Sequence, residues 1–510
     1  MTKQLPVKHT QLASLPSFAW GAIYNHDTLE LEVFHGKGVE QSADGTSLVE
    51  GAWNGKFTDF DFCQSSVFCG TGLTRLNGEL LFSSSTDGMA ALFSIRKDEH
   101  LYISKSAIFA ISLADAKPHP LYPFYNHDVL KVFRGGLHDP AGETRLADGR
   151  TLRIHVCTIV AIKPNGEIEY RIHPAGEVPD GFDHYRNILT NSIAEVLKNG
   201  KDPMRKCGFE SAAAISTGYD SCTTASLARD AGCTVAHTFY DTKLDDPHAD
   251  SGARNAAALG MECREYDRWA YLKSNTPIEA EFSLITSGGN ATLLAMEKDL
   301  QHRIYIVGSH GEISWGLTRI AYFGQLGGQW RRSISNISQV EYRLRIGYIV
   351  FAPALIALRH NQAIAKISHD TSMQPWSIGG EYNRPISRRI CEEAGIPRDQ
   401  FGIKKYAGGH SNLSSRESFS DVGDASYSDF LDRQTKDTPT LLLCYWKARF
   451  FITNFVYYKL TSKKRKSAHS TPLRRKFPFI LNAPPQRYPW KYAFTFQWAF
   501  DELKHRYQTK

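Results

Sequence analysis

Residues Ser216 to Ser221 bring hydroxyl groups, a glycine and an aspartate together within six consecutive positions. They follow the apolar run AAI and precede a helix-like stretch, TTASLARDAG. In an open α/β sheet, such a turn lies at the carboxyl end of a strand, where the next helix presents unpaired N–H groups to anions. Glycine lets the backbone close around phosphate oxygens, hydroxyls donate to them, and aspartate can hold magnesium. The turn predicts a phosphate site formed by Ser216, Thr217, Gly218, Tyr219, Asp220 and Ser221, although an ordinary strand-to-helix turn can carry the same residues.

The elements that would position this turn change in character along the chain. The 510 residues are 42% hydrophobic and 12% aromatic, which favours a globular protein with two or three domains. The first part contains the short β-type runs FAWGAIY, ELLFSSS, ALFSIRK, HLYISKS and RIHVCTIVAI, separated by turn signals. This pattern predicts an antiparallel β-sandwich. From about Tyr185, helix-like and strand-like segments alternate, which predicts an α/β domain with a parallel sheet.

The formal charge of +7 is concentrated in one stretch, TSKKRKSAHSTPLRRK, from Thr461 to Lys476. Such a run is usually a solvated loop, which we expect here, although it can also bind nucleic acid or anionic lipid. The apolar segment LLLCYWKARFFITNFVYYKL precedes it. Because Lys447 and Arg449 interrupt that segment, we expect a buried helix, or else an interfacial one, and no membrane span.

Two further patterns bear on the cellular compartment. The first residues lack a long apolar core and a small-residue cleavage pattern, so we expect no signal peptide and a cytoplasmic protein. The nine cysteines form no CxxC pair and no zinc-type spacing with histidine, which favours reduced, mostly buried thiols.

The turn at 216–221 resembles the Ser-Gly-Gly-x-Asp-Ser pyrophosphate loop of the ATP pyrophosphatases. Its surroundings, YRNILTNSIAEVLKN before it and DSGARNAAALGMECREY after it, are similar to asparagine synthetase and β-lactam synthetase. The later stretch RIYIVGSHGEISWGL resembles the second strand-loop of that family, which closes over pyrophosphate and its metal. One residue is missing from the pattern, and Glu312 stands where the family has Asp. The resemblance implies a pyrophosphate contact at Gly311 and magnesium ligation by Asp220 and Glu312.

A third segment, SIGGEYNRPISRRICEEAGIPRDQFGIKKYAGG, resembles the Gly-x-Glu-x-x-x-Pro segment and the catalytic lysine of the synthetases. By this correspondence Glu381 is the active-site glutamate, with Pro385 four residues later, and Lys405 or its neighbour Lys404 is the lysine. An amine that attacks an acyl-adenylate must lose a proton to a base, and a fixed cation stabilises the negative charge of the intermediate. Taken singly, Glu381 could also pair with Arg384 or Arg388.

The first part resembles the class II glutamine amidotransferase domain that precedes the synthetase domain in this family. The runs EGAWNGKFTDF and ETRLADGRTLRIHV contribute to that resemblance. In working glutaminases an N-terminal cysteine is the nucleophile. Here its place falls near Phe18 to Trp20, behind an extension, and no cysteine lies there. We therefore expect a degenerate domain that serves as a scaffold and does not hydrolyse glutamine.

Together these resemblances imply a fold and a function. The implied fold is an α+β domain of the Ntn-hydrolase type (1–184), an α/β domain of the adenine nucleotide α-hydrolase type (185–440) and a helical, basic extension (441–510). The implied function is an ATP-dependent, AMP-forming carbon-nitrogen ligase that uses Mg²⁺ and joins a small carboxylate to an amine or ammonia.

Two alternatives stay open, an inactive scaffold or regulator and an adenylating enzyme that acts on RNA, of which we do not expect the second. The substrates, the pathway and the oligomeric state also stay open, with a dimer as one option.

Overall fold

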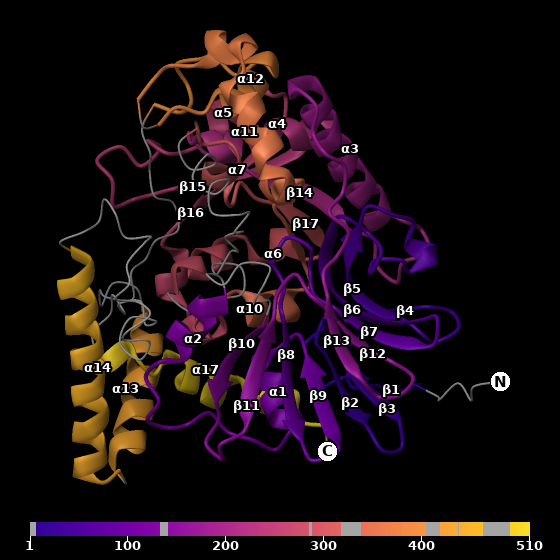
Figure 1. Cartoon of the computed structure of the whole chain (residues 1–510). Coiled ribbons are helices and arrows are strands. Elements are labelled where there is room, and N and C mark those ends of the chain that lie inside the picture. Colours follow the sequence, from indigo (N-terminus) through magenta and orange to yellow (C-terminus); the bar gives the residue numbers. More distant parts are fainter. Residues whose placement is uncertain are drawn as a thin grey trace.

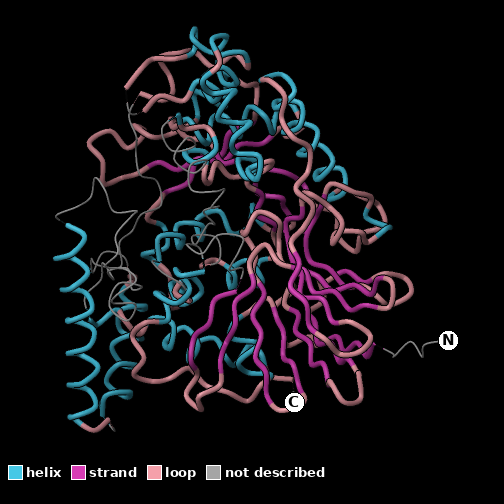
Figure 2. The backbone as a smooth tube through the Cα atoms, viewed as in Figure 1, coloured by secondary structure: helices cyan, strands magenta, loops and turns pink. Residues whose placement is uncertain are grey.

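Two β-sheets pack face to face in the first half of the chain, and a third sheet forms in the second half (Figures 1 and 2). The computed structural model describes residues 7–132, 141–284, 288–317, 338–380, 382–403, 419–436, 438–462 and 490–509. Within these residues the protein is a mixed α/β structure with three sheets.

The first sheet has seven strands and is antiparallel except for its edge, where β1 runs parallel to β3. The strand β1 lies in the extension that precedes the first strand predicted from the sequence. The spatial order is β1 (Val7–Gln11), β3 (Leu31–His35), β2 (Trp20–Asn25), β9 (His100–Ser104), β8 (Leu92–Lys97), β11 (Thr151–His155) and β10 (Ala141–Arg145).

The second sheet has six antiparallel strands, and its inner face shares a core with the first sheet. Trp20 of β2 and Phe82 of β7, for example, stack with their ring centroids 6.4 Å apart. The β6–β7 hairpin turns through Asn77 and Gly78, both with positive φ, as a two-residue type I′ turn requires. The spatial order is β13 (Ile168–Arg171), β12 (Ile159–Ile162), β7 (Glu79–Ser83), β6 (Phe68–Leu76), β5 (Leu48–Trp53) and β4 (Glu40–Gln41).

These two sheets confirm the predicted sandwich, with one correction. The run RIHVCTIVAI is two strands in different sheets, since β11 ends at His155 and β12 begins at Ile159. Between them Cys157 adopts φ 54°. A left-handed residue breaks the strand and lets the chain cross from one sheet to the other. Composition alone hid this break, because β-type residues continue across it from Ile154 to Ile162.

The third sheet has five parallel strands, as the alternation of segments after Tyr185 predicts. Its order is β16 (Glu262–Asp267), β15 (Val235–Tyr240), β14 (Glu210–Ala214), β17 (Arg303–Ile306) and β18 (Ile349–Phe351). The described helices are α1 (Ala107–Leu113), α2 (Tyr125–Val132), α3 (Phe182–Gly200), α4 (Tyr219–Asp230), α5 (Ala253–Ala258), α6 (Glu297–Leu300), α7 (Gly311–Ser314), α10 (Val340–Ile346), α11 (Asn361–His369), α12 (Pro385–Glu393), α13 (Asp421–Lys436), α14 (Thr440–Ser462) and α17 (Thr495–Leu503).

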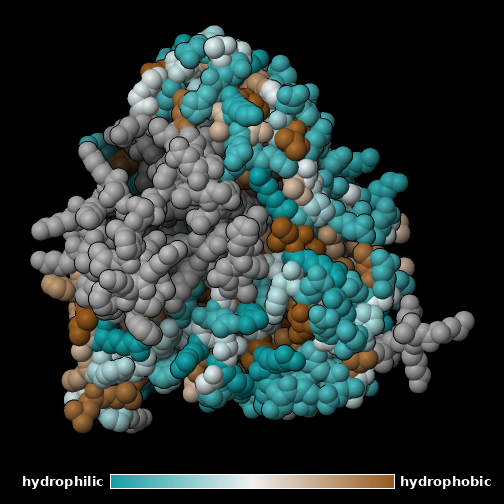
Figure 3. Space-filling model, in the orientation of Figure 1, coloured by the Kyte–Doolittle hydropathy of each residue, from teal (hydrophilic) through white to brown (hydrophobic). Residues whose placement is uncertain are grey.

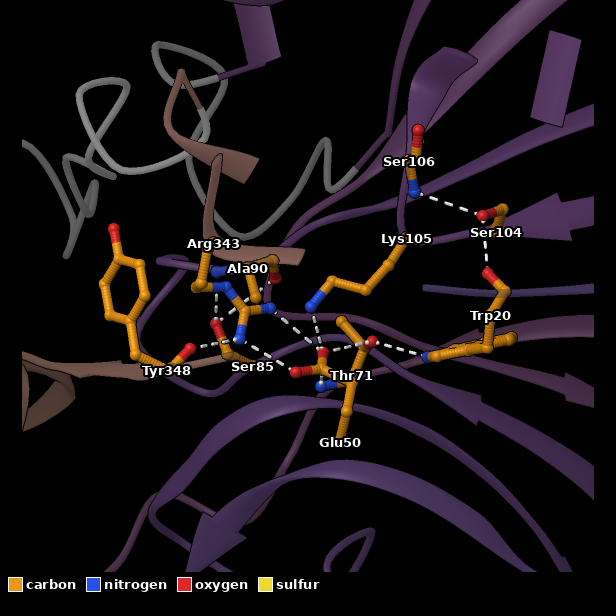
Figure 4. A network of polar contacts seen from close by, with 10 residues as sticks. All are labelled: Trp20, Glu50, Thr71, Ser85, Ala90, Ser104, Lys105, Ser106, Arg343 and Tyr348. Atoms are coloured by element: carbon orange, nitrogen blue, oxygen red, sulfur yellow. Dashed lines mark hydrogen bonds and ion pairs between the residues drawn. The ribbon is translucent and has the colours of Figure 1, made fainter. Parts of the chain in front are cut away.

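A buried cluster of charges joins the sandwich to the second half of the chain (Figure 4). Arg343 of α10 donates to both carboxylate oxygens of Glu50, at 2.8 and 3.0 Å, and Lys105 forms a second ion pair with Glu50. The amide and hydroxyl of Thr71 also donate to Glu50, at 3.0 and 2.8 Å, and the indole of Trp20 donates to the Thr71 hydroxyl at 2.9 Å. Every carboxylate oxygen here has protein partners, which a charge without water requires.

The end of the chain packs against the first half. Tyr507 stacks on Phe109 of α1 with ring centroids 5.0 Å apart, and Figure 1 shows the C-terminus beside the sandwich. Helix α14 departs from expectation, because the outer face of the predicted buried helix is exposed. No described helix is long and apolar enough to cross a membrane. Six of the nine cysteines are buried and all are free, as the sequence predicts.

Candidate active site

The candidate site lies at the carboxyl edge of the parallel sheet, between β14 and β17. The chain moves from the central strand β14 outward through β15 to β16, and then returns to β17 on the other side of β14. The connections after β14 and β17 therefore leave in opposite directions. Such a reversal is a topological switch point, where open α/β sheets bind their ligands.

The turns that follow these two strands are in direct contact. A Cβ atom on Gly308 would lie 2.6 Å from the backbone carbon of Asp220, and one on Gly311 would collide with the Asp220 carboxylate. Only glycine leaves room for this approach. The structure thus brings together the two segments that the sequence assigns to one phosphate site.

Hydrogen bonds within the first turn give it its shape. The hydroxyl oxygens of Ser216 and Ser221 are 2.8 Å apart, and the amide of Gly218 donates to the Ser216 hydroxyl at 3.1 Å. The amide of Ser216 donates to the Ser221 hydroxyl at the same distance. Helix α4 begins at Tyr219 without a side-chain cap. Its first turn therefore presents N–H groups to which an anion can bind.

Three residues that sequence reasoning did not choose hold the turn from outside. Asp250 accepts a hydrogen bond from the Thr217 hydroxyl at 2.9 Å, and burial raises the pKa of its carboxyl. The Asn255 amide donates to the Ser216 carbonyl at 3.1 Å, and the Gly402 amide donates to the Thr217 carbonyl at 2.9 Å. In the sequence, the one indication of a role for Asn255 is that a polar amide lies within an otherwise alanine-rich helix.

Arg384 forms an ion pair with Asp220, the predicted metal ligand. The Arg384 side chain is only 6% exposed, whereas that of Asp220 is 23% exposed. The guanidinium carbon lies 5.1 Å from the ring centroid of Tyr382 and 5.9 Å from that of Tyr219. Burial lowers the pKa of Arg384 to about 10, so the group stays charged at neutral pH. A fixed cation thus lies beside the 216–221 turn.

Arg388, the second arginine that the sequence offers as a partner for Glu381, lies one helical turn after Arg384, within α12. It pairs with Glu392 at 3.1 Å and donates to the Tyr219 hydroxyl. Arg388 therefore holds the side chain of Tyr219, the first residue of helix α4.

A magnesium ion would have few protein ligands at this site. Glu312 lies in the first turn of α7, directly after Gly311. Across the part of the chain that the structure describes, no group of three or more His, Cys, Asp or Glu side chains could hold a metal ion. Magnesium commonly binds one or two carboxylates and completes its shell with phosphate oxygens and water. Asp220 is paired with Arg384, and the assignment of Asp220 and Glu312 as magnesium ligands stays a prediction.

The predicted catalytic residues Glu381, Lys404 and Lys405 lie outside the described residues. Their described neighbours are at the turn. Tyr382 has its hydroxyl 4.0 Å from the position that a Cβ of Gly218 would take, and Gly402 is bonded to Thr217. Tyr382 and Gly402 thus both lie at the turn.

No family model and no curated protein matches the sequence. Among solved structures, the glutamine-dependent NAD+ synthetase from Acinetobacter baumannii, in complex with ADP, is a weak neighbour. The alignment has a TM-score of 0.24 and 13% identity and covers 72% of this chain and 65% of that chain. This chain thus spans less than two thirds of the length of that synthetase. A similarity of this size carries no argument about function.

Proposed function

We propose that the protein is an ATP-dependent amide ligase. A substrate carboxylate attacks the α-phosphate of ATP and pyrophosphate leaves; an amine or ammonia then attacks the acyl carbon, and AMP leaves. The observation that carries this proposal is the contact of the 216–221 turn with Gly308 and Gly311 at the switch point of the parallel sheet.

The turn supplies the groups that pyrophosphate needs. The N-terminus of helix α4 offers backbone N–H groups, and Arg384 offers a cation that the protein already holds in place. Asp220 and Glu312 would hold magnesium, which supplies positive charge to neutralise the phosphate oxygens. In this proposal the phosphates and the metal replace the pairing between Arg384 and Asp220.

The second half-reaction needs a base and a cation at the acyl carbon. Glu381 would accept the proton of the attacking amine, and Lys405 would stabilise the negative charge of the tetrahedral intermediate. Lys404 is the alternative to Lys405. These roles rest on the sequence resemblance and on the position of their neighbours Tyr382 and Gly402.

We also propose that the nitrogen comes from ammonia or an amine substrate and not from glutamine. At the place of a glutaminase nucleophile, Phe18, Ala19 and Trp20 are all buried, and Trp20 donates to Thr71 beside the charge cluster. In this proposal residues 1–184 are a scaffold, 185–440 the ligase domain and 441–510 a helical, basic extension. Glutamine should be no better a nitrogen source than the same concentration of ammonium.

The decisive experiment is a screen of carboxylic acids, led by aspartate, for acid-dependent release of pyrophosphate from ATP. The Asp220→Ala variant should release none above background. Asp148→Ala is the matched control, because it also removes the carboxylate of an arginine pair, 2.5 Å from Arg150, in the sandwich. Ordinary release by Asp220→Ala, or none by the folded parent with any acid, would contradict the proposal; the latter outcome would favour an inactive scaffold.

A further inference from the structure

Helix α14 exposes one apolar face along its described length. Leu441 is 87% exposed, Ile452 58% and Phe455 62%. At 3.6 residues per turn, these and four further exposed residues fall within an arc of about 120°, while Leu442, 42% exposed, lies outside it. This apolar arc consists of Leu441, Cys444, Tyr445, Ala448, Phe451, Ile452 and Phe455, all exposed. In Figure 3 hydrophobic residues gather at the left edge, where Figure 1 places α14.

The opposite face of helix α14 packs against the rest of the protein. The Trp446 ring lies 5.9 Å from that of Tyr122, and the Phe450 ring lies 6.3 Å from that of Phe124 and 5.3 Å from that of Trp490. Helix α14 is therefore held in place by one side while it presents the apolar arc on the other. Monomeric proteins rarely expose a continuous apolar surface of this kind without a partner.

Positive charge borders the apolar arc on both sides. Lys447 and Arg449, both exposed, fall on opposite flanks of the arc. The surrounding sequence is uniformly basic, since residues 438–500 contain twelve Lys and Arg residues and no Asp or Glu. The partner should therefore be both apolar and negatively charged.

We propose that the apolar arc of α14 binds the surface of an anionic lipid bilayer, with the helix lying in the plane of the interface. An apolar face that enters the acyl boundary, with lysine and arginine at its edges, is the arrangement that interfacial helices use. Each cation near an anionic membrane adds electrostatic attraction. A second copy of the chain would bring the cations at the edges of the arc, Lys447 and Arg449, against like charges, and RNA would leave the apolar arc exposed to water.

Cosedimentation with vesicles tests this proposal on the full-length protein. Binding should be at least tenfold stronger to phosphatidylcholine vesicles containing 30% phosphatidylserine than to pure phosphatidylcholine, and should weaken with salt. The triple variant Leu441→Ser, Ile452→Ser, Phe455→Ser should lose binding by at least tenfold. The matched control Ile172→Ser, Val178→Ser, Met204→Ser removes apolar residues that are 46%, 56% and 71% exposed elsewhere, and should bind like the parent.

Several outcomes would overturn the proposal. Absence of binding to anionic vesicles would do so, as would equal binding by the two triple variants. A homodimer that the α14 variant dissociates, or RNA retention without vesicle binding, would assign the surface to another partner. The assay contains no ATP, so its failure would leave the proposed ligase untouched.

Discussion

Two ion pairs join distant parts of this chain, and they differ in how completely the protein surrounds them. Glu50 in the sandwich has no exposed side-chain surface and receives hydrogen bonds from Arg343, Lys105 and Thr71 (Figure 4). Asp220 in the turn pairs with Arg384 but keeps 23% of its side chain exposed, beside the N-terminus of a helix. The first carboxylate is saturated by protein, and the second can exchange its partner.

Under the proposed function, the difference separates a structural charge from a functional one. A buried, fully bonded pair fixes how the sandwich meets the second half of the chain, and any loss leaves an unpaired charge without water. A partly exposed pair at a phosphate-type turn costs less to open, because water, metal or phosphate can replace the partner. The predictions below test this contrast from the largest expected effect to the smallest.

Removal of the saturated carboxylate should be the most destabilising change. Glu50→Ala leaves Arg343 and Lys105 buried without their partner and should lower the free energy of unfolding by about 3–5 kcal/mol. Urea denaturation measures this. The control Glu32→Ala breaks an exposed pair with Lys8 and should cost at most about 1 kcal/mol. A Glu50 variant as stable as the control would contradict the proposed difference between the Glu50 and Asp220 ion pairs.

Loss of the proposed catalytic groups should affect turnover and not stability. Glu381→Gln and Lys405→Ala should each slow pyrophosphate-coupled turnover about 100-fold or more, the scale of a general base or an oxyanion donor, with little change in ATP affinity. Steady-state kinetics with the identified acid measures both quantities. Lys404→Ala should be mild. A large loss at Lys404 with none at Lys405 would move the assignment by one residue.

A methyl group at the contact between the two turns should disturb the open ion pair. Gly311→Ala would force the Asp220 carboxylate to move and should lower the free energy of unfolding by about 1–3 kcal/mol. The variant should also lose pyrophosphate release. The control Gly208→Ala meets no atom within 4 Å and should change stability by less than about 0.5 kcal/mol. Full activity of Gly311→Ala would show that the two turns need not touch.

A buried carboxyl at the same interface as Glu50 should make stability depend on pH. Burial raises the pKa of Glu341 to about 7, and the Ser106 hydroxyl donates to it at 2.6 Å. The unfolded chain loses this proton near pH 4.5 and the folded chain only near pH 7. Stability should therefore be highest below pH 4.5 with respect to this group, and should fall between pH 4.5 and 7.

Glu341→Gln should remove this fall while it changes stability at pH 4.5 by less than about 1 kcal/mol, because glutamine is as neutral as the protonated acid. Urea titrations at a series of pH values measure the slope. An unchanged slope in the variant would mean that Glu341 is ionised across this range.

Local sequence patterns predicted several elements of the fold. Alternating β-branched and aromatic runs marked β2, β7, β8 and β9, and helical spacing marked α3, because these elements depend on residues close together in the chain. The same patterns failed where the environment decides. β-type residues continue through the run that ends at Ile162, so nothing in it showed the change of sheet at Cys157. The segment 441–460 is apolar on both faces, so its composition suggested burial.

The sequence by itself determined the chemistry available at the turn. Hydroxyls, a glycine and an aspartate lie close together there because they occupy six consecutive positions in the chain. It also determined the strand and helix types that place this turn at a sheet edge. The tertiary structure decided which distant groups meet there. Arg384 lies 164 residues after Asp220 and Gly311 lies 91 residues after it, and only the strand order β16-β15-β14-β17-β18 brings them together. Contacts between residues so far apart in the sequence depend on how whole elements pack. The entropy of closing a long loop changes little with its length and so does not select which residues meet.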